Sequence, residues 1–452
     1  MVDAIIEGGT VVTMDQSRRI IRDGAVAMDE GRIAQVGSRD QVRKEYRGDH
    51  IVDARDKAVI PGLVNVHVHT SEKLVPGLAD DLDLYSWLKK IINPMMVNLT
   101  EEDCYWSSLL AQAEMIRSGI TCFSDHFDTT IENIFDTLLR SVEASGMRGV
   151  ISREIFTKDD LPGELALSVS DDIDKKMLAD TVTHAKRTVG RASRASVRLG
   201  LGGISYASES LMSTIRSLAS ELKVGIHVHV AESIDELRYF KQKKGTTPIR
   251  YAREIGLLGP DVLLAHCVWV DSEEINMLKE TGSKVAYNPI SNMKLADGVA
   301  PIPRMLEKGV TVGLGTDGAA SNDNQDMFAC MKMGAYLQKV HASNPVLLPS
   351  QMILEMATVD GARALQMDKL IGSIEVGKKA DLTVIDLNAP NMTPTNDLVK
   401  QIVCSCTPSN VDTVIIDGEV VLEDRKFKRL DEARMIREAR ERATQLVKRM
   451  YN

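Results

Sequence analysis

The chain has 452 residues, of which 44% are hydrophobic and 26% charged, and its formal net charge is −9. This is the composition of an ordinary globular enzyme with one large domain and a smaller one, or with two or three domains. The negative balance argues against nucleic-acid binding. Neither a signal peptide nor an uninterrupted apolar run of about 18 residues is evident, so we expect a cytoplasmic protein without a membrane span. The six cysteines lack metal-finger spacing, and we expect reduced thiols.

The two ends of the chain share a pattern of short alternating strands. Residues 1–60 include AIIEGGTVVTM and GAVAMDEGRIAQVG, and residues 370–428 include KADLTVIDL and DTVIIDGEVVLEDRKF. The dipeptides Glu30-Gly31 and Asp417-Gly418 are typical of hairpin turns. We therefore expect these two segments to form one small sheet domain, with residues 61–369 inserted between them.

The inserted segment alternates β-branched runs with stretches of helical period, which predicts βα units and a parallel sheet. Eight strands with intervening helices are typical of a (β/α)8 barrel. A doubly wound sheet needs fewer strands, and no glycine-rich fingerprint follows an early strand. The strand candidates are residues 63–69, 119–126, 148–155, 197–204, 224–230, 262–268, 283–289 and 310–317.

The last segment, residues 429–452, has the period of an amphipathic helix. Its apolar residues are spaced three or four apart, so we expect one face to pack on the rest of the protein. That face consists of Ile436, Ala439, Ala443, Leu446 and Met450.

Polar residues stand at the C-terminal ends of the predicted strands, where barrels carry their chemistry. His67 and His69, in PGLVNVHVHT, are two residues apart and so face the same side of a strand. His229, His266 and Asp317 end strands five, six and eight. Each alone has an ordinary explanation, such as a core histidine or a helix cap. Their coincidence at one end of the barrel predicts a metal site, because a shared ion satisfies several imidazole nitrogens at once.

Glu232 follows His229 by three residues in HVAES, just past the strand end. A carboxylate there can carry protons between a metal-activated water and a leaving group. The alternative is an acidic residue in the first turn of a helix, which the helix dipole favours. We favour the catalytic role.

Motifs along essentially the whole chain resemble the amidohydrolase superfamily, and within it the cytosine-deaminase-like branch. That branch includes methylthioadenosine/S-adenosylhomocysteine deaminases, guanine deaminases and the triazine hydrolases (atrazine chlorohydrolase, melamine deaminase). The resemblance implies a (β/α)8 barrel flanked by a small β-sandwich built from both chain ends. The motifs are PGLVNVHVHT, HVAES, LLAHCVW, NPISNMKLADGVAPIP, GLGTDGAASNDNQDMF and GSIEVGKKADLTVIDL.

The resemblance also implies a role for each of these residues. It implies that His67, His69 and His229 are metal ligands, and that Asp317 is a ligand that also accepts the proton of the water. His266 then polarises the water or the substrate, and Glu232 is the proton shuttle. Ser321 falls where triazine hydrolases have a pocket side chain, and Asn322 beside it is expected to stabilise the turn.

The number of metal ions follows from the fourth strand. Binuclear relatives bridge two ions with a modified lysine there, and VRLGLGGISYAS contains no lysine. We therefore predict one divalent ion, with zinc expected and iron as the alternative. Two further histidines are left open. His227 is either a partner behind the ligands or a core residue, and His126 either approaches the pocket or packs in the core.

For the substrate, chain length, the position of Trp87 and the run ILEMATVDGARALQMDKLIGSIEVGKKADL are similar to the triazine hydrolases. Nucleoside deaminases carry a glutamate two residues before this tryptophan, where LDLYSWL has Tyr85, and a histidine after strand four that LGGISYAS lacks. NPISNMKL is more similar to the deaminases. Leu84, Tyr85 and Trp87 are candidate pocket residues, and Trp87 either stacks on a flat ring or packs in a lid helix.

We therefore predict a metal-dependent hydrolytic deaminase of an amino-substituted N-heteroaromatic ring, such as an aminotriazine or a purine base. A bound metal lowers the pKa of water from about 15.7 to about 7, and Glu232 would protonate the ring before ammonia leaves. Alternatives are a dechlorinating triazine hydrolase and a nucleoside deaminase of the methylthioadenosine/S-adenosylhomocysteine type. A catalytically inactive binding barrel is a further alternative, but it would need no proton shuttle. The resemblance implies a homo-oligomer.

Overall fold

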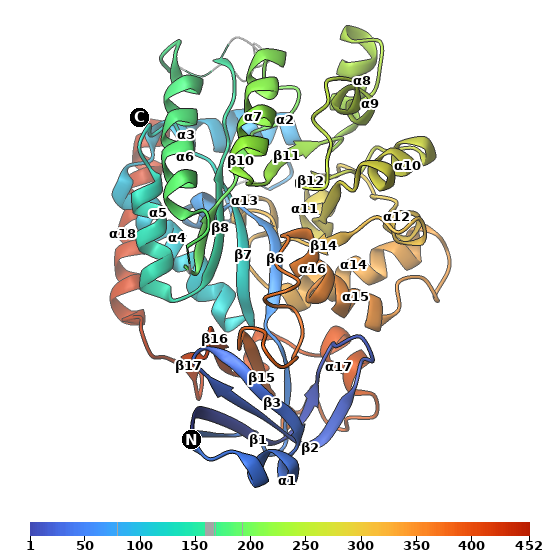
Figure 1. Ribbon diagram of the computed structural model, residues 1–452. Helices are drawn as coiled ribbons and strands as arrows, with labels where there is room; N and C mark the ends of the chain where they lie inside the picture. The colour runs from blue at the N-terminus through green and yellow to red at the C-terminus, as the bar shows by residue number, and fades with distance from the viewer. Residues whose placement is uncertain (79, 159–166, 168, 192) are drawn as a thin grey trace.

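The computed structural model describes residues 1–78, 80–158, 167, 169–191 and 193–452. A barrel of parallel strands surrounded by helices forms one part, and a sheet made from both chain ends lies beneath it (Figure 1). The fold class predicted from the sequence is confirmed. The residue limits assigned above to the two domains stay a prediction.

The barrel strands pair in parallel in chain order. The fourth position is split at Arg198, where β9 pairs with β8 and β10 pairs with β11. The barrel closes where the Asp317 amide, just past β14, donates to the His67 carbonyl at 3.0 Å. The strands are β6 (Leu63–Val68), β7 (Ile120–Phe127), β8 (Arg148–Arg153), β9 (Ala195–Val197), β10 (Leu199–Leu201), β11 (Ile226–Val230), β12 (Val262–His266), β13 (Lys284–Tyr287) and β14 (Val312–Leu314).

Most barrel strands are buried along their whole length, because side chains fill the interior on one face and helices cover the other. Several outer helices begin at residues whose side chains cap them; Thr100 and Asp271, for example, form capping boxes. The longer ones are α4 (Glu101–Arg117), α5 (Phe135–Ser145), α6 (Ile173–Thr188), α7 (Glu209–Leu222), α8 (Ile234–Lys243), α10 (Ser272–Thr281) and α14 (Met327–His341). Shorter ones are α9 (Pro248–Glu254), α11 (Pro289–Lys294), α12 (Ile302–Glu307), α13 (Ala319–Asn322), α15 (Ser350–Met356), α16 (Val359–Ala364) and α17 (Leu398–Cys404).

A helical excursion follows β6 before the chain returns to the barrel. It starts with the 3-10 turn η1 (Thr70–Leu74) and continues through α2 (Leu84–Trp87), the π-helical turn η2 (Leu88–Ile92) and α3 (Asn93–Asn98). In Figure 1 the segment α2–α3 lies near the upper, C-terminal ends of the barrel strands. It is therefore placed to contact whatever binds there.

The lower sheet joins the two ends of the chain, because β5 pairs antiparallel with β15. The predicted hairpins are present: Glu30-Gly31 connects β2 to β3 and Asp417-Gly418 connects β16 to β17, all four with positive φ. The strands are β1 (Val2–Val12), β2 (Ile20–Asp29), β3 (Arg32–Ser38), β4 (Gly48–Asp53), β5 (Lys57–Pro61), β15 (Leu382–Asp386), β16 (Val411–Ile416), β17 (Glu419–Glu423) and β18 (Lys426–Phe427), and helix α1 (Arg39–Glu45) follows β3.

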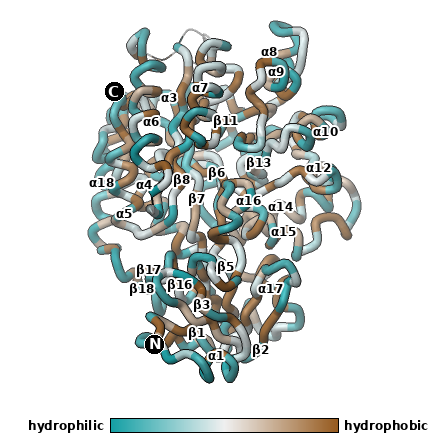
Figure 2. The backbone as a smooth tube through the Cα atoms, in the orientation of Figure 1, coloured by the Kyte–Doolittle hydropathy of each residue, from teal (hydrophilic) through white to brown (hydrophobic). Residues whose placement is uncertain are grey.

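The C-terminal helix α18 (Glu432–Tyr451) packs along α4, and Figure 2 shows hydrophilic and hydrophobic positions along it. Its phase differs from the prediction in one place: Ile436 is 42% exposed, and Met435 is buried against Trp106 and Leu109 instead. Ala439 and Leu446 are buried as predicted. In the first turn of α18, Met435 therefore faces Trp106, and Ile436 faces solvent.

A buried ion pair joins the barrel to the C-terminal segment. Arg148 of β8 donates from Nε to Asp381 Oδ2 at 2.8 Å and from Nη2 to Oδ1 at 3.0 Å, and both side chains are buried. Asp381→Ala is expected to lower the free energy of unfolding by about 3–5 kcal/mol, because it removes both hydrogen bonds from a buried guanidinium and leaves only the Asp417 carboxylate, 3.8 Å from Nη2, as counter-charge. Chemical denaturation measures this change. The double variant Arg148→Met/Asp381→Leu should recover most of the loss, and equal destabilisation in both variants would contradict the explanation.

Within the described residues, no helix has the length and apolarity needed to cross a membrane. All six cysteines carry free thiols.

Candidate metal centre

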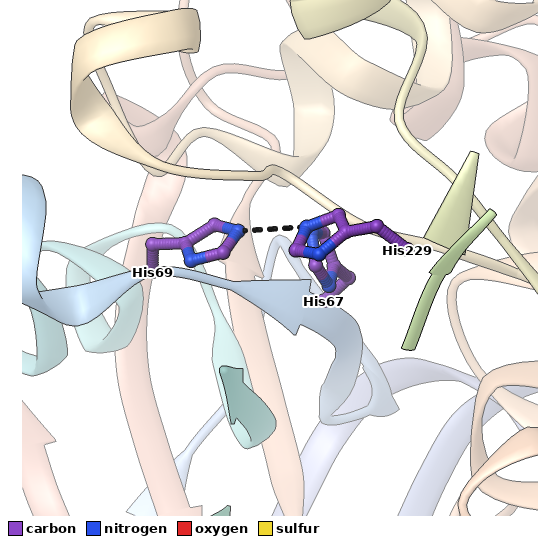
Figure 3. A group of neighbouring side chains, drawn as sticks. All are labelled: His67, His69 and His229. Carbon is purple, nitrogen blue, oxygen red and sulfur yellow. Dashed lines mark hydrogen bonds between the residues drawn. The ribbon is translucent and has the colours of Figure 1, made fainter. Parts of the chain in front are cut away.

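Four side chains converge at the C-terminal end of the barrel. His67 lies in β6 and His69 directly after it, His229 lies in β11, and Asp317 follows β14. The Nε2 atoms of His69 and His229 are 3.3 Å apart, and Asp317 Oδ1 is 3.4 Å from Nε2 of both His67 and His69. Figure 3 shows the imidazoles of His67, His69 and His229 pointing toward one another, the first two from β6 and the residue after it and the third from β11.

The contacts of the remaining nitrogens decide which ones carry protons. Nδ1 of His229 lies 2.5 Å from the Gly202 carbonyl, and Nδ1 of His69 lies 3.0 Å from Asp128 Oδ2. Both partners only accept, so each Nδ1 carries the proton and each Nε2 presents a lone pair. Two lone pairs facing each other at 3.3 Å repel unless a cation lies between them.

The donor set fits a divalent metal ion. Nε2 of His67 is buried and has no hydrogen-bond partner among the described residues. Nitrogen and oxygen ligands about 2.1 Å from a tetrahedral ion lie about 3.4 Å apart, which matches the spacings above. Three imidazoles and a carboxylate can therefore hold such an ion.

The protonation of the groups agrees with this fit. Burial lowers the pKa of His67 and His229, so both imidazoles are neutral. Burial also lowers the pKa of His69, but the Asp128 carboxylate more than offsets it and the pKa is raised well above its ordinary value. Burial opposes ionisation of Asp317, yet His67 holds its pKa well below the ordinary range. The cluster thus requires positive charge at His69, which a metal ion can supply as well as a proton.

His266 and Glu232 lie beside these four residues. His266 Nε2 is 3.4 Å from Glu232 Oε1 and 3.8 Å from Asp317 Oδ2. Asn292 Nδ2 contacts both His266 Nδ1, at 2.9 Å, and Asp297 Oδ2, at 3.2 Å. Since a carboxylate only accepts, Asn292 donates to both, and the single proton of the neutral His266 is on Nε2. Burial lowers the pKa of His266 to about 3, which keeps it neutral.

Backbone strain is concentrated at the same strand ends. Ala231 (φ 53°), His266 (φ 74°), Cys267 (φ 48°) and Asp317 (φ 64°) have left-handed conformations although none is glycine. Such conformations cost energy and persist where the surrounding structure enforces them, often at functional sites. Here they turn the chain at the ends of β11, β12 and β14, at or next to the residues of the site.

The two histidines left open by the sequence lie behind the cluster. His227 Nε2 contacts His67 Nδ1 at 2.9 Å, so it orients the ring of His67. His126 is buried, and its nitrogens contact Ser152 Oγ and the Leu201 carbonyl at 2.9 Å each. His126 is therefore satisfied by the barrel itself.

Three carboxylates beside the cluster, two of them buried and Glu154 half-buried, were not predicted. Asp128 contacts His69 as described, Glu154 Oε1 lies 3.2 Å from His229 Nδ1, and Glu72 Oε2 accepts from the Ala320 amide at 2.8 Å. The available signals were positional, since Asp128 and Glu154 follow directly after β7 and β8. Reading acidic residues at those strand ends could have found both.

A cavity opens at the cluster. Of the predicted pocket residues, Leu84, Trp87 and Ser321 line it. Tyr85 instead bonds its phenol to Tyr206, and Asn322 donates from Nδ2 to the Thr316 carbonyl at 2.6 Å and so braces the turn. Trp87 is 6% exposed, and its indole Nε1 has no hydrogen-bond partner among the described residues. A ligand with an acceptor atom can therefore satisfy it.

Comparison with known sequences identifies relatives over the full length. The amidohydrolase family profile matches residues 58–421, and an imidazolonepropionase-like composite domain of bacteria matches residues 24–48. The 5'-deoxyadenosine deaminase of Methanosarcina mazei is 39% identical over 453 residues, covering 100% of both chains. The 5-methylthioadenosine/S-adenosylhomocysteine deaminase of Desulforamulus reducens is 37% identical over 443 residues, covering 98% of both.

Solved structures give the same architecture. A zinc-bound adenosine deaminase from Xanthomonas campestris superposes with a TM-score of 0.92 at 29% identity, covering 99% of both chains. A zinc complex of an atrazine chlorohydrolase from Arthrobacter aurescens gives a TM-score of 0.88 at 22% identity, covering 97% of this chain and 100% of that one. The triazine hydrolases thus share the fold, whereas the sequence relatives described above are named as nucleoside deaminases.

Proposed function

The chain belongs to the amidohydrolase family, and we propose that it removes ammonia from the purine ring of an adenosine-type nucleoside. It is a hydrolase of carbon–nitrogen bonds in cyclic amidines. The observation that carries the nucleoside assignment is the full-length similarity to nucleoside deaminases at 37–39% identity. From the sequence we predict an aminotriazine or a purine base as the substrate and a nucleoside as an alternative; here we favour the nucleoside.

In this proposal His67, His69, His229 and Asp317 hold one divalent cation, with zinc before iron. When bound, the cation supplies a water acidic enough to be deprotonated near neutral pH. Asp128, Gly202 and His227 hold the three imidazoles in the orientation and tautomer that ligation needs. The single ion, like an oligomeric assembly and a cytoplasmic location, stays a prediction.

The chain's own residues then move the protons. Asp317 accepts a proton from the nucleophilic water. Glu232 donates a proton to a ring nitrogen, and its raised pKa, caused by burial and by Asp297 and Asp317, favours the protonated form that can donate. It then takes a proton from the hydroxyl group newly added to the ring carbon and passes it to the departing amine, and the proton held by Asp317 restores the protonated Glu232. His266 presents Nε2–H to the developing negative charge.

The cavity is also suited to a purine nucleoside. The indole N–H of Trp87, which has no hydrogen-bond partner within the part of the chain that the structure describes, can donate to an acceptor nitrogen of the ring. The carboxylates that line the cavity can accept from ribose hydroxyls. A second candidate is deamination of a free heteroaromatic base. Tyr85 and the histidine-free stretch LGGISYAS favour it, because they stand where nucleoside deaminases carry a glutamate and a histidine.

An ammonia-release screen tests the function. The metal-loaded protein is assayed with adenosine, 5′-deoxyadenosine, 5′-methylthioadenosine, adenine, guanine, a pterin and an aminotriazine. We expect the nucleosides to have kcat/KM at least about tenfold above the free bases, because binding energy from the sugar is available only to them. Turnover of a base or triazine alone would replace the nucleoside assignment with the second candidate. If none of the compounds releases ammonia, the proposal that the protein is a deaminase is refuted.

Asn292 is expected to act through the tautomer of His266. Asn292→Leu removes the donor to Nδ1 at nearly constant volume and should lower kcat by about 10–100-fold with metal content unchanged. KM should change little, since Asn292 acts only through His266. Steady-state kinetics with metal analysis measures both quantities, and wild-type kcat in this variant would show that the tautomer needs no support.

A further inference from the structure

One wall of the cavity comes from the excursion that follows β6. Side chains of α2, η2 and α3 line the cavity there, and most of them are apolar. They are Leu84, Trp87, Leu88, Ile92, Asn93 and Met96. Because these side chains would contact a bound ligand, the position of the excursion determines the shape of the site.

The excursion ends in a tight turn between α3 and α4. Only Leu99 and Thr100 separate Asn98, the last residue of α3, from the first residue of α4. The amide and the hydroxyl of Thr100 donate to Asp103 Oδ2 at 2.9 and 2.7 Å. Asp103 is fully buried, so its carboxylate needs a cationic partner.

Arg449, in the last turn of α18, is that partner. Its Nη2 donates to Asp103 Oδ2, and its Nε donates to the Asn98 carbonyl at 2.9 Å. Carbonyls at the end of a helix lack an intrahelical partner and carry partial negative charge, so a cation is favourable there. One guanidinium thus connects the end of α3 to the start of α4.

The backbone that carries Arg449 is itself held in place. Leu446, one turn earlier in α18, is fully buried, and the helix contacts η1, α3 and α4. In Figure 1 the C-terminus lies at the upper end of the molecule, on the side of α3. Arg449 therefore extends from a packed helix and can act as a fixed support.

The neighbouring polar contact of α3 is weaker. The amide and the hydroxyl of Thr130 donate to the Met96 carbonyl at 3.4 and 3.1 Å. Hydrogen bonds from a charged donor are shorter and stronger than these neutral ones. We therefore expect Arg449 to contribute more than Thr130 to the position of α3.

We propose that Arg449 is a positioning residue of the active site. It holds the turn between α3 and α4, and through it the cavity wall formed by η2 and α3, in the geometry that binds substrate. The assay of this inference by ammonia release rests on the proposed function, whereas the contacts themselves do not. The C-terminal helix thus acts on the affinity for substrate without touching it.

The position of this wall should change KM and leave kcat nearly unchanged. Its side chains lie apart from the groups that transfer protons, Glu232, His266 and Asp317, so they contact the ground state and the transition state alike. A loss of such uniform binding raises KM alone.

Arg449→Met tests the inference, because it removes both donors and keeps an apolar stem of similar length. We expect KM to rise about threefold to tenfold, with kcat within about twofold of the wild-type value. Amide hydrogen exchange of residues 84–98 should be about tenfold faster, while that of β11 stays unchanged. Steady-state kinetics and exchange measured on the same metal-loaded sample give both results.

Arg437→Met is the matched control. It removes a guanidinium from the same helix, where the side chain is 66% exposed and lies 3.8 Å from Glu438. It should leave KM and the exchange of residues 84–98 at their wild-type values. A lower kcat with unchanged KM in Arg449→Met, or faster exchange spread evenly over the whole protein, would show a merely structural role and overturn the inference.

Arg449→Lys keeps a positive charge beside Asp103 and protects the test against a failure of the methionine variant to fold. An ammonium does not reproduce the forked geometry of a guanidinium, so KM should still rise by about twofold to fivefold. Wild-type KM and wild-type exchange of residues 84–98 in this variant would overturn the inference. If the wild-type protein releases no ammonia from any compound, the proposed function fails, and the exchange measurement still decides whether Arg449 holds the wall.

Discussion

Replacing Glu232 by glutamine is expected to abolish turnover and to leave the metal in place. The variant keeps the size of the side chain and removes its ability to give up a proton, so kcat should fall by about 10³–10⁴. The metal should stay because Glu232 contacts His266 at 3.4 Å and is not one of the four converging side chains. Single-turnover ammonia release and metal analysis on the same sample measure both outcomes.

The structure explains why Glu232 is so sensitive. The left-handed Ala231 turns the chain at the end of β11, and the Glu232 amide donates to Glu236 Oε2 at 2.9 Å, which fixes the backbone. Glu236→Gln is the matched control, because an amide oxygen can still accept that bond. Its loss of activity should be far smaller. Comparable activity of Glu232→Gln and the wild-type protein would remove Glu232 from the proton transfer.

The barrel and the converging side chains could be predicted because local sequence carries the signal. His67 and His69 are two residues apart in a β-branched run, so any strand there must present both on one face. His229, His266 and Asp317 each end such a run, and parallel strands bring their ends together. Neither inference needs knowledge of how the helices pack.

The residues that the sequence did not predict act through contacts between distant segments. Glu72 looks like an ordinary helix acid until the Ala320 amide, which is 248 residues away in the chain, is found against it. Asn292 gains its role only because Asp297 fixes the direction of its amide. The phase of α18 was missed at Ile436 because the Trp106 surface, and not the helix period, decides which residue of the first turn is buried.

The substrate shows a similar limit. Tyr85 and Trp87 are both candidate pocket residues from the sequence, yet the indole lines the cavity itself, whereas the phenol of Tyr85 bonds to Tyr206, which lines it. The presence of Tyr85 in place of the glutamate of nucleoside deaminases is therefore weaker evidence against ribose binding than the sequence motif indicates. Which side chains of this segment face the cavity depends on how α2 continues into the π-helical turn η2. A short sequence motif does not predict that helical geometry.

Replacing His67 by alanine is expected to cause loss of the metal and of activity together. The other three donors remain, but the vacated side of the site is fully buried, so the protein offers no replacement ligand and water enters at a cost. Metal content after dialysis should fall to background, and kcat should fall below detection. The stabilisation that a bound ion gives the native state should also be lost, so added zinc should no longer raise the melting temperature.

His50→Ala provides the control for this experiment. His50 lies at the surface, with a side chain 49% exposed beside Glu423, so the substitution removes an imidazole without touching the cluster. It should keep the metal, the activity and the zinc-dependent rise in melting temperature. An unchanged metal stoichiometry in His67→Ala would contradict the ligand assignment, since Nε2 of His67 is a buried nitrogen with no other partner among the described residues. Loss of metal with activity retained would instead separate the ion from the chemistry and leave Glu232 and His266 to act on water alone.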